Sequence, residues 1–347
     1  MMSKRPDAIS YEFDFQPGLG ETADILPGLK WLRLPLPFML GHINVWLLRD
    51  GDGWAIVDTG IHTGPTRGAW EKVFSAQLGH APVSRVLVTH LHPDHAGCAG
   101  WLCETHGVEL YMTSEEYLLC RILVSDTGRP APAEGQRFYR AAGFNEQQMT
   151  RYVEMFGAFG KVVAQLPQSY RRLREGQTLQ IGQTGWQVIT GRGHSPEHAC
   201  LHDPSRNVLI SGDQVLPTIS SNVSVYPTEP AANPLADWFD SLHRLKTRLP
   251  PDVLVLPSHG RPFRGVMARL DELIEEHEHG LEKLRRLCRR PQRAVDVFPA
   301  LFKSEITDSN LMMATGEAIA HLHYLLFAGE LEAETDDAGV CWYRTGN

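Results

Sequence analysis

The sequence predicts a large domain of the α+β class, followed by a small and mostly helical domain. Short apolar runs bounded by glycine and aspartate occur between residues 44 and 256, and they predict strands. Segments with helical periodicity lie between these runs. After Pro262 the pattern changes to a long charged helix at 265–290, with further helices and a hairpin after it. We therefore expect domains at 1–264 and 265–347.

Strands and helices alternate in the first part of the large domain. Residues 1–40 are rich in proline and glycine, and we expect them to wrap the surface. Strands are expected at 44–48 and 53–57, because the Asp-Gly-Asp-Gly stretch that joins them is a turn signal. The elements expected next are a helix at 64–79, a strand at 83–89, a helix after Pro93 and a short strand at 109–112.

A helical insertion is expected at about 113–172, where the alternation stops. Apolar residues recur there at helical spacing, at Met149, Tyr152, Val153, Phe156 and Phe159. This stripe fits either a helix packed on the core or a helical cap that contributes an apolar pocket wall. Beyond the insertion we expect strands at 177–181, 186–190, 199–202, 208–211 and 253–256, a helix at 234–247, and a terminal hairpin at 329–334 and 340–344.

Composition narrows the class of protein. The chain has 347 residues, of which 42% are hydrophobic, so it has ample material for a large core. Its 33 basic and 41 acidic residues give a formal charge of −8, which argues against binding to nucleic acid phosphates. No apolar run is long enough to span a membrane, and residues 1–7 lack the apolar segment of a secretory signal. We therefore expect a cytoplasmic protein with no membrane partner.

The run Thr-His-Leu-His-Pro-Asp-His at residues 89–95 carries the chemistry. It follows an apolar strand directly, at the point where α/β proteins place ligand-binding groups. His90 and His92 can converge on one metal ion, while Asp94 and His95 lie at a helix start and can turn toward a second. Imidazole and carboxylate ligands together suit zinc, iron or manganese.

Three later strand ends offer further metal ligands. His194 lies in Gly-His-Ser-Pro-Glu-His, Asp213 in Ser-Gly-Asp-Gln, and His259 in Ser-His-Gly. Each follows a predicted strand and a small or glycine residue, which allows close approach of the backbone. Four separate loops would thus bring five histidines and two aspartates to one edge of a sheet. The remaining histidines of this region, including His42, are interpreted as ordinary.

In these motifs and their order, residues 40–265 resemble the metallo-β-lactamase superfamily. The resemblance also includes Asp58 in Val-Asp-Thr-Gly. It implies an αββα sandwich with the site along one edge. In that arrangement His90, His92 and His194 would bind the first metal, and Asp94, His95 and His259 the second. Asp213 would bridge the two metals, with Asp58 and His198 supporting the ligands from behind.

The resemblance implies a hydrolase in which two metal ions activate a bridging hydroxide, with Asp94 and Asp213 as its catalytic carboxylates. Zinc is the default metal, with iron or manganese as alternatives. The favoured substrate is a small molecule with a reactive carbonyl group, such as a thioester, a lactone or another ester. Two alternatives stay open. One is a phosphodiesterase or endoribonuclease-like hydrolase, and the other is a metal-binding sensor without catalysis.

The C-terminal region bears on the nucleic acid alternative. Residues 280–347 resemble the small winged-helix-like domain attached to some hydrolases of this superfamily. Residues 309–327, which would form its recognition helix, contain no lysine or arginine, and the wing carries five acidic residues between 330 and 337. A basic run between Arg285 and Arg293 is interpreted as a solvated helix face, partly paired with Glu278 and Glu282. We expect a packing or oligomerisation module that closes one side of the cleft.

Overall fold

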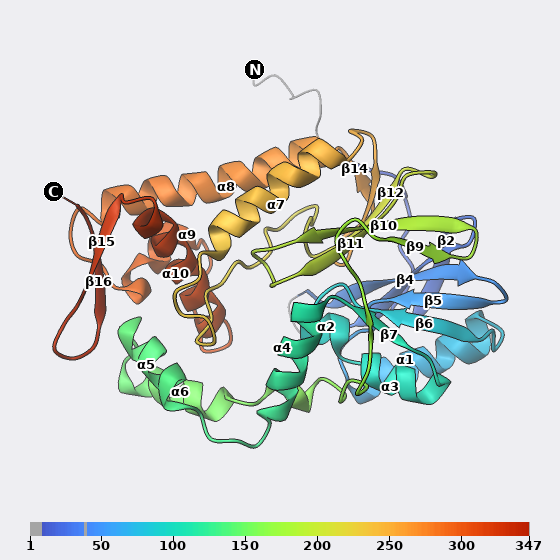
Figure 1. Cartoon of the computed structure of the whole chain (residues 1–347), viewed down its shortest axis with the longest axis horizontal. Coiled ribbons are helices and arrows are strands. Elements are labelled where there is room, and N and C mark those ends of the chain that lie inside the picture. The colour runs from blue at the N-terminus through green and yellow to red at the C-terminus, as the bar shows by residue number, and fades with distance from the viewer. Residues whose placement is uncertain (1–8, 38–39, 347) are drawn as a thin grey trace.

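Two facing β-sheets of seven strands each form the centre of the large domain (Figure 1). The computed structural model describes residues 9–37 and 40–346. In spatial order, the first sheet contains β2 (Glu21–Leu26), β3 (Leu29–Pro35), β4 (His42–Asp50), β5 (Gly53–Val57), β6 (Val83–Leu87), β7 (Leu110–Met112) and β8 (Arg171–Arg172). The second contains β1 (Ser10–Tyr11), β14 (Phe263–Arg264), β13 (Leu254–Pro257), β12 (Val208–Gly212), β11 (His198–Asp203), β10 (Thr184–Gly191) and β9 (Thr178–Ile181).

Helices cover the outer face of each sheet. The first sheet carries α1 (Gly64–Lys72), which continues as a π-helical turn at Val73–Gln77, and the pair α2 (Pro93–Ala96) and α3 (Ala99–His106). The second sheet carries α7 (Pro234–Arg248) and α8 (Val266–Leu287). The layers are therefore αββα, and the predicted fold class is confirmed.

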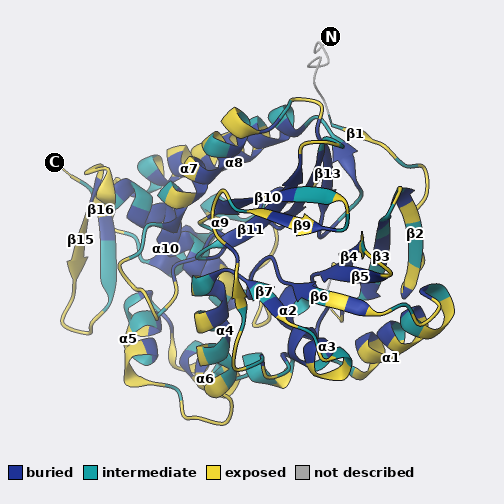
Figure 2. Cartoon of the chain, turned by 45° about the vertical axis from the view of Figure 1, so that its right-hand side comes forward, coloured by how far each residue is buried: buried dark blue, intermediate teal, exposed yellow. Residues whose placement is uncertain are grey.

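The alternation of side chains along the central strands explains the layers. In β4, Val45 and Leu47 pack beneath the helices of the first sheet, whereas Trp46 and Leu48 point into the space between the sheets. Successive side chains of a strand point to opposite faces, so a strand that is covered on both faces is apolar throughout. Figure 2 shows most strands of both sheets as largely buried, whereas exposed residues lie on the outer helices, the loops and the C-terminal hairpin.

The expectation that residues 1–40 wrap the surface is wrong for most of the described part. Residues 1–8 and 38–39 lie outside the described residues, but β2 and β3 form a hairpin on the first sheet. Leu29, Trp31 and Leu34 of β3 are fully buried. Pro27 and Gly28 form the turn of this hairpin and do not interrupt its strands. The run Leu-Lys-Trp-Leu-Arg-Leu buries apolar side chains on both faces of β3, and this decides the local structure.

The insertion and the C-terminal segment contact each other. The insertion contains α4 (Ser114–Ser125), α5 (Ala133–Ala141), α6 (Glu146–Met155) and a 3-10 turn at Phe159–Lys161. The C-terminal segment contains a 3-10 turn at Ala294–Val297, α9 (Phe298–Leu301), α10 (Leu311–Phe327) and the hairpin of β15 (Leu331–Thr335) and β16 (Cys341–Thr345). Tyr139, Met149 and Tyr152 of the insertion share one apolar core with Ile319 of α10.

The apolar stripe of the insertion is only partly buried. Met149 and Tyr152 are buried in the shared core, but Val153 is 47% exposed. The stripe therefore packs on the C-terminal helices as well as on the large domain. In the described part of the chain, no helix combines the length and the apolarity that a membrane span requires.

Candidate metal centre

Strand ends from both sheets deliver the predicted site residues to one edge of the sandwich. Asp58 follows β5 and the run at 89–95 follows β6, and these two strands are parallel neighbours. Asp213 follows β12 and His259 closely follows β13, which are parallel neighbours in the other sheet. His194 follows β10. The carboxyl ends of parallel strands meet at the same edge, so chain direction alone brings these loops together.

Three histidines form a first group of nitrogen atoms. Nε2 of His90 lies 2.9 Å from Nδ1 of His92 and 3.2 Å from Nε2 of His194. The three nitrogens all lie within 4.8 Å of one another, which is close enough for one ion to contact all of them.

A second group contains Asp94, His95 and His259. Oδ2 of Asp94 lies 3.2 Å from Nε2 of His259 and 3.6 Å from Nε2 of His95. Their ligand atoms also lie within 4.8 Å of one another. Two imidazoles and one carboxylate are an ordinary donor set for a divalent transition metal.

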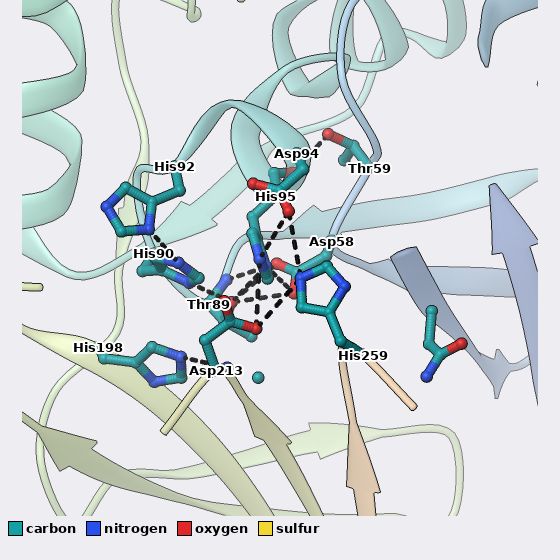
Figure 3. A network of polar contacts seen from close by, with 12 residues as sticks. Asp58, Thr59, Thr89, His90, His92, Asp94, His95, His198, Asp213 and His259 are labelled. Atoms are coloured by element: carbon teal, nitrogen blue, oxygen red, sulfur yellow. Dashed lines mark hydrogen bonds and ion pairs between the residues drawn. The ribbon is translucent and has the colours of Figure 1, made fainter. Parts of the chain in front are cut away.

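Asp213 lies between the two groups (Figure 3). One carboxylate oxygen, Oδ2, is 3.6 Å from Nε2 of His194 in the first group. The other, Oδ1, is 3.5 Å from Nε2 of His95 and 3.7 Å from Nε2 of His259 in the second group. The structure thus brings all seven predicted ligands close together, and a third set of ligand atoms, from His90, His95 and Asp213, spans the two groups.

In two of the histidines, a hydrogen bond from Nδ1 leaves the lone pair of Nε2 facing the other ligand atoms. Nδ1 of His194 donates to the backbone carbonyl of Asn222 at 2.7 Å, and Nδ1 of His259 donates to that of His42 at 2.9 Å. In each ring the other nitrogen, Nε2, is therefore unprotonated in the neutral form. Nε2 of His95, Nε2 of His259 and Oδ1 of Asp213 are buried and have no hydrogen-bond partner within the described residues. Such orphaned donor atoms fit a bound cation.

Burial and mutual contact control the charges of the site. Burial lowers the pKa of His92 to about 3, and the nearby His194 adds to this effect. Burial alone would raise the pKa of Asp94, but His95 and His259 lower it to about 2. At neutral pH His92 is therefore a neutral ligand and Asp94 a carboxylate, which are the forms that bind metal.

Asp58 fixes the orientation of His95. Its Oδ2 accepts a hydrogen bond from Nδ1 of His95 at 2.8 Å, and its Oδ1 accepts one from the backbone N–H of Thr89 at 2.8 Å. Asp58 has a φ of +63°, a left-handed conformation that aspartate tolerates better than most residues. Burial lowers the pKa of His95, but the carboxylates of Asp94, Asp213 and Asp58 outweigh it and raise that pKa well above the usual value.

His198 lies behind Asp213, where a supporting residue was predicted. Its Nε2 accepts a hydrogen bond from the backbone N–H of Asp213 at 3.1 Å, and its ring is fully buried. Gly212 permits this contact, because a Cβ there would lie 2.4 Å from Nε2 of His198 and the backbone φ is +52°.

Two supporting residues were not predicted from the sequence. Glu116 of α4 is fully buried, and its carboxylate accepts hydrogen bonds from the backbone N–H of Leu91 at 2.9 Å and from the hydroxyl of Ser195 at 2.6 Å. Asn222 orients His194, as described above, through its backbone carbonyl. Neither residue belongs to a recognisable motif, and both depend on contacts between segments far apart in the sequence.

Comparisons with known proteins identify the class to which this fold and site belong. The model of the metallo-beta-lactamase superfamily matches residues 39–259, and that of the metallo-beta-lactamase-like C-terminal domain matches residues 281–346. The chain belongs to the metallo-β-lactamase superfamily. It is a metal-binding hydrolase of that class.

Relatives of known sequence or structure agree with this assignment. A probable metallo-hydrolase, YqjP, from Bacillus subtilis is 26% identical over 305 residues, which cover 85% of this chain and 91% of that protein. The human acyl-coenzyme A thioesterase MBLAC2 is 25% identical over 54% of this chain and 63% of its own length. A crystal structure of a beta-lactamase domain protein from Burkholderia ambifaria is 43% identical, with a TM-score of 0.89 over 97% of this chain and 98% of that one.

Proposed function

We propose that the chain hydrolyses a carbonyl substrate, a thioester above all, with two divalent metal ions held by the seven residues described. The observation that carries the two-metal proposal is the position of Asp213, whose two oxygens face different groups of ligands. One oxygen directed at each group is the arrangement expected of a carboxylate that bridges two ions. Zinc is the metal that we expect for this donor set, with iron or manganese as the alternatives.

Divalent ions bound there would lower the pKa of a water molecule and polarise the substrate carbonyl. The protein contributes fixed geometry: Asp58, Asn222 and the carbonyl of His42 orient three of the histidines. Asp94, which lies beside His95 and His259, is the carboxylate that we expect to accept a proton from the attacking water. Asp213 contacts both groups of ligands and would hold them at a fixed separation.

The surroundings of the site support a substrate with an apolar part. Large exposed apolar side chains occur on α4 at Leu118 and Ile122, on the loop after Asp213 at Ile219 and Tyr226, and on α10 at Met313. All three segments are connected to the site by hydrogen bonds. Glu116 on α4 accepts one from Ser195, the carbonyl of Asn222 in the loop accepts one from His194, and Glu317 on α10 accepts one from the side chain of Asn222. Exposed apolar groups on segments that are connected to the site favour an acyl chain. The thioesterase activity named for MBLAC2 points to the same class.

The phosphodiester alternative has less support. Three arginines of the basic run pair with acidic groups. Arg285 of α8 makes a bidentate pair with Glu330 of the hairpin at 2.5 and 2.8 Å. Arg286 pairs with Glu282, as expected, and Arg293 pairs with Asp296. Paired arginines next to an acidic hairpin form a poor surface for a phosphate backbone.

The proposal is tested by metal analysis and a substrate panel. Protein purified without added metal should contain at least two ions per chain, and His92→Ala and Asp213→Ala should each lose metal and activity. His243→Ala, which removes an exposed histidine of α7, is the matched control and should change neither. The panel contains acyl-coenzyme A thioesters, lactones, a cyclic phosphodiester and short RNA. Hydrolysis of RNA alone would overturn the choice of substrate, and normal metal content in both variants would overturn the assignment of ligands.

A further inference from the structure

A second cluster of metal-ligand side chains lies outside the candidate metal centre, between α8 and α10. His277 belongs to α8, and Glu317 and His321 belong to α10, one helical turn apart on the same face. His277 is 4% exposed and His321 is 3% exposed. One ligand atom from each of the three residues lies within 4.8 Å of the other two.

The hydrogen bonds of the two rings leave lone pairs that face each other. Nδ1 of His321 donates to the backbone carbonyl of Glu317 at 2.8 Å, so Nε2 of the neutral ring is unprotonated. Nε2 of His277 lies 3.1 Å from the hydroxyl of Ser220, which can accept a hydrogen bond from it. Nδ1 of the neutral His277 ring is then unprotonated. Nδ1 of His277 lies 3.1 Å from Nε2 of His321.

That separation suits two nitrogens on one ion. Nitrogens bound to a tetrahedral zinc ion at about 2.0–2.1 Å lie about 3.3 Å apart. In the candidate metal centre the corresponding distance, from Nε2 of His90 to Nδ1 of His92, is 2.9 Å. The competing interpretation is a neutral pair in which Nδ1 of His277 donates a hydrogen bond to His321.

The third member of the cluster favours the cation. The carboxylate of Glu317 is largely enclosed, and its Oε2 accepts a hydrogen bond from Nδ2 of Asn222 at 2.7 Å. A neutral pair of histidines would do nothing to stabilise the carboxylate, whereas a cation between the rings would.

A cavity of about 490 Å³ adjoins the cluster. His277, Glu317 and His321 form part of its wall, together with Lys283 and Lys303. Glu276 also lines the cavity, so its wall carries charges of both signs. The cavity has room for a water molecule or a small anion as a further ligand.

We propose that His277, Glu317 and His321 bind one divalent transition-metal ion, separate from the ions of the candidate metal centre. Two imidazoles and one carboxylate supply three ligands, and the remaining position opens to the cavity. The donor set suits zinc best, and cobalt is a suitable probe for it. This site goes beyond the proposed hydrolytic function and does not depend on it.

The ion would join the C-terminal helices to the loop that supports the candidate metal centre. Ser220 and Asn222 of that loop contact His277 and Glu317, respectively. The backbone carbonyl of the same Asn222 orients His194. An ion bound at this site would therefore restrain the loop that orients His194, without taking part in the reaction.

The test compares metal binding in three variants of the full chain. Metal-free protein is titrated with zinc, and bound zinc is measured after gel filtration. Glu317→Gln and His321→Gln should each bind one ion fewer than wild type. His279→Gln, which changes an exposed histidine on the same helix and the same cavity wall, should bind as many as wild type. The comparison rests on this difference of one ion, so it holds whether the candidate metal centre binds one ion or two.

A crystal grown with cobalt locates the ion directly. We expect an anomalous peak between His277 and His321, in addition to those of the candidate metal centre. The proposal is overturned if the wild-type map has peaks only at the candidate metal centre. It is also overturned if Glu317→Gln, which keeps the shape of the side chain, retains the full count of ions.

Discussion

At the scale of single residues, the site depends on groups that never touch the reacting atoms. Asp58 shows this most clearly. It accepts a hydrogen bond from Nδ1 of His95, and this fixes the tautomer whose Nε2 faces Asp94 and Asp213. The same carboxylate holds the backbone of Thr89, directly before the first predicted ligand. One buried side chain thereby positions both ends of the run at 89–95.

We expect Asp58→Asn to weaken metal binding about 10–100-fold, because supporting carboxylates of this kind contribute that much to metal affinity. Asparagine tolerates the left-handed backbone at this position, so the fold should persist. Competition with a chromophoric chelator measures the affinity. Asp52→Asn, in the exposed turn between β4 and β5, is the control and should leave it unchanged. Equal affinities in the two variants would remove Asp58 from the positioning role.

At the scale of elements, the insertion is part of the site as well as a cover over it. Oε1 of Glu116 on α4 accepts hydrogen bonds from the Ser195 hydroxyl at 2.6 Å and from the backbone N–H of Glu197 at 2.8 Å. Its Oε2 accepts one from the backbone N–H of Leu91 at 2.9 Å. Leu91 and Ser195 are direct neighbours of three predicted ligands. The carboxylate of Glu116 thus connects the start of α4, through hydrogen bonds, to two loops of the candidate metal centre.

Replacing Glu116 by glutamine should lower both the stability of the fold and the metal affinity. One oxygen becomes an NH₂ group, which cannot accept the hydrogen bonds made there, so we expect a loss of about 1–3 kcal/mol in unfolding free energy. Glu115→Gln changes the exposed neighbour on the same helix and is the matched control. Thermal melts with and without zinc measure both effects. A melting temperature equal to that of the control in both conditions would contradict this role.

A turn between two strands of the second sheet should give the protein a pH-dependent contribution to stability. Asp203 at the end of β11 is fully buried, and it accepts hydrogen bonds from the backbone N–H and hydroxyl of Ser205 and pairs with Arg206. Burial would raise the pKa of Asp203, but these hydrogen bonds outweigh it and lower that pKa below the usual value. A lowered folded-state pKa means that the stabilisation is complete above the unfolded-state pKa of about 3.9.

We therefore expect Asp203→Asn to lose about 1.5–3 kcal/mol at pH 7, which is typical of hydrogen bonds to a charged group. The difference from wild type should shrink as the pH falls below about 4, because the wild-type carboxyl then becomes protonated. Urea denaturation at a series of pH values measures it. Asp240→Asn changes a carboxylate that is 70% exposed, and it should have little effect at any pH. A difference that persists unchanged at low pH would exclude the charge as its origin.

The convergence of the histidines and aspartates at the strand ends could be predicted from the sequence, because each motif is local and the parallel strands bring the motifs together. Glu116 and Asn222 could not be predicted, because their roles arise from contacts between distant segments. The hairpin of β2 and β3 was missed because the prolines and glycines around it and in its turn obscured a short apolar run. Nor does the spacing of His277 and His321, on different helices, indicate that the rings meet.

At the scale of the whole molecule, the C-terminal segment is built into the large domain. One apolar core contains Trp238 and Leu242 of α7, Leu270 of α8, and Leu322 of α10. The insertion adds Tyr139, Met149 and Tyr152 to the same core. A segment held by so many shared buried contacts cannot unfold without exposing apolar surface of the large domain. It is therefore a structural part of the hydrolase, and not a module attached through a flexible linker.

Calorimetry can test this shared core with one pair of variants. Leu322 is fully buried, so Leu322→Ala should lower the unfolding free energy by about 2–5 kcal/mol. Phe327 on the same helix is 60% exposed, and Phe327→Ala should cost less than about 0.5 kcal/mol. If the core is shared, Leu322→Ala shifts one transition in which activity and helical signal disappear together. If the C-terminal segment folded on its own, the variant would instead split the transition, and hydrolysis would survive the first step.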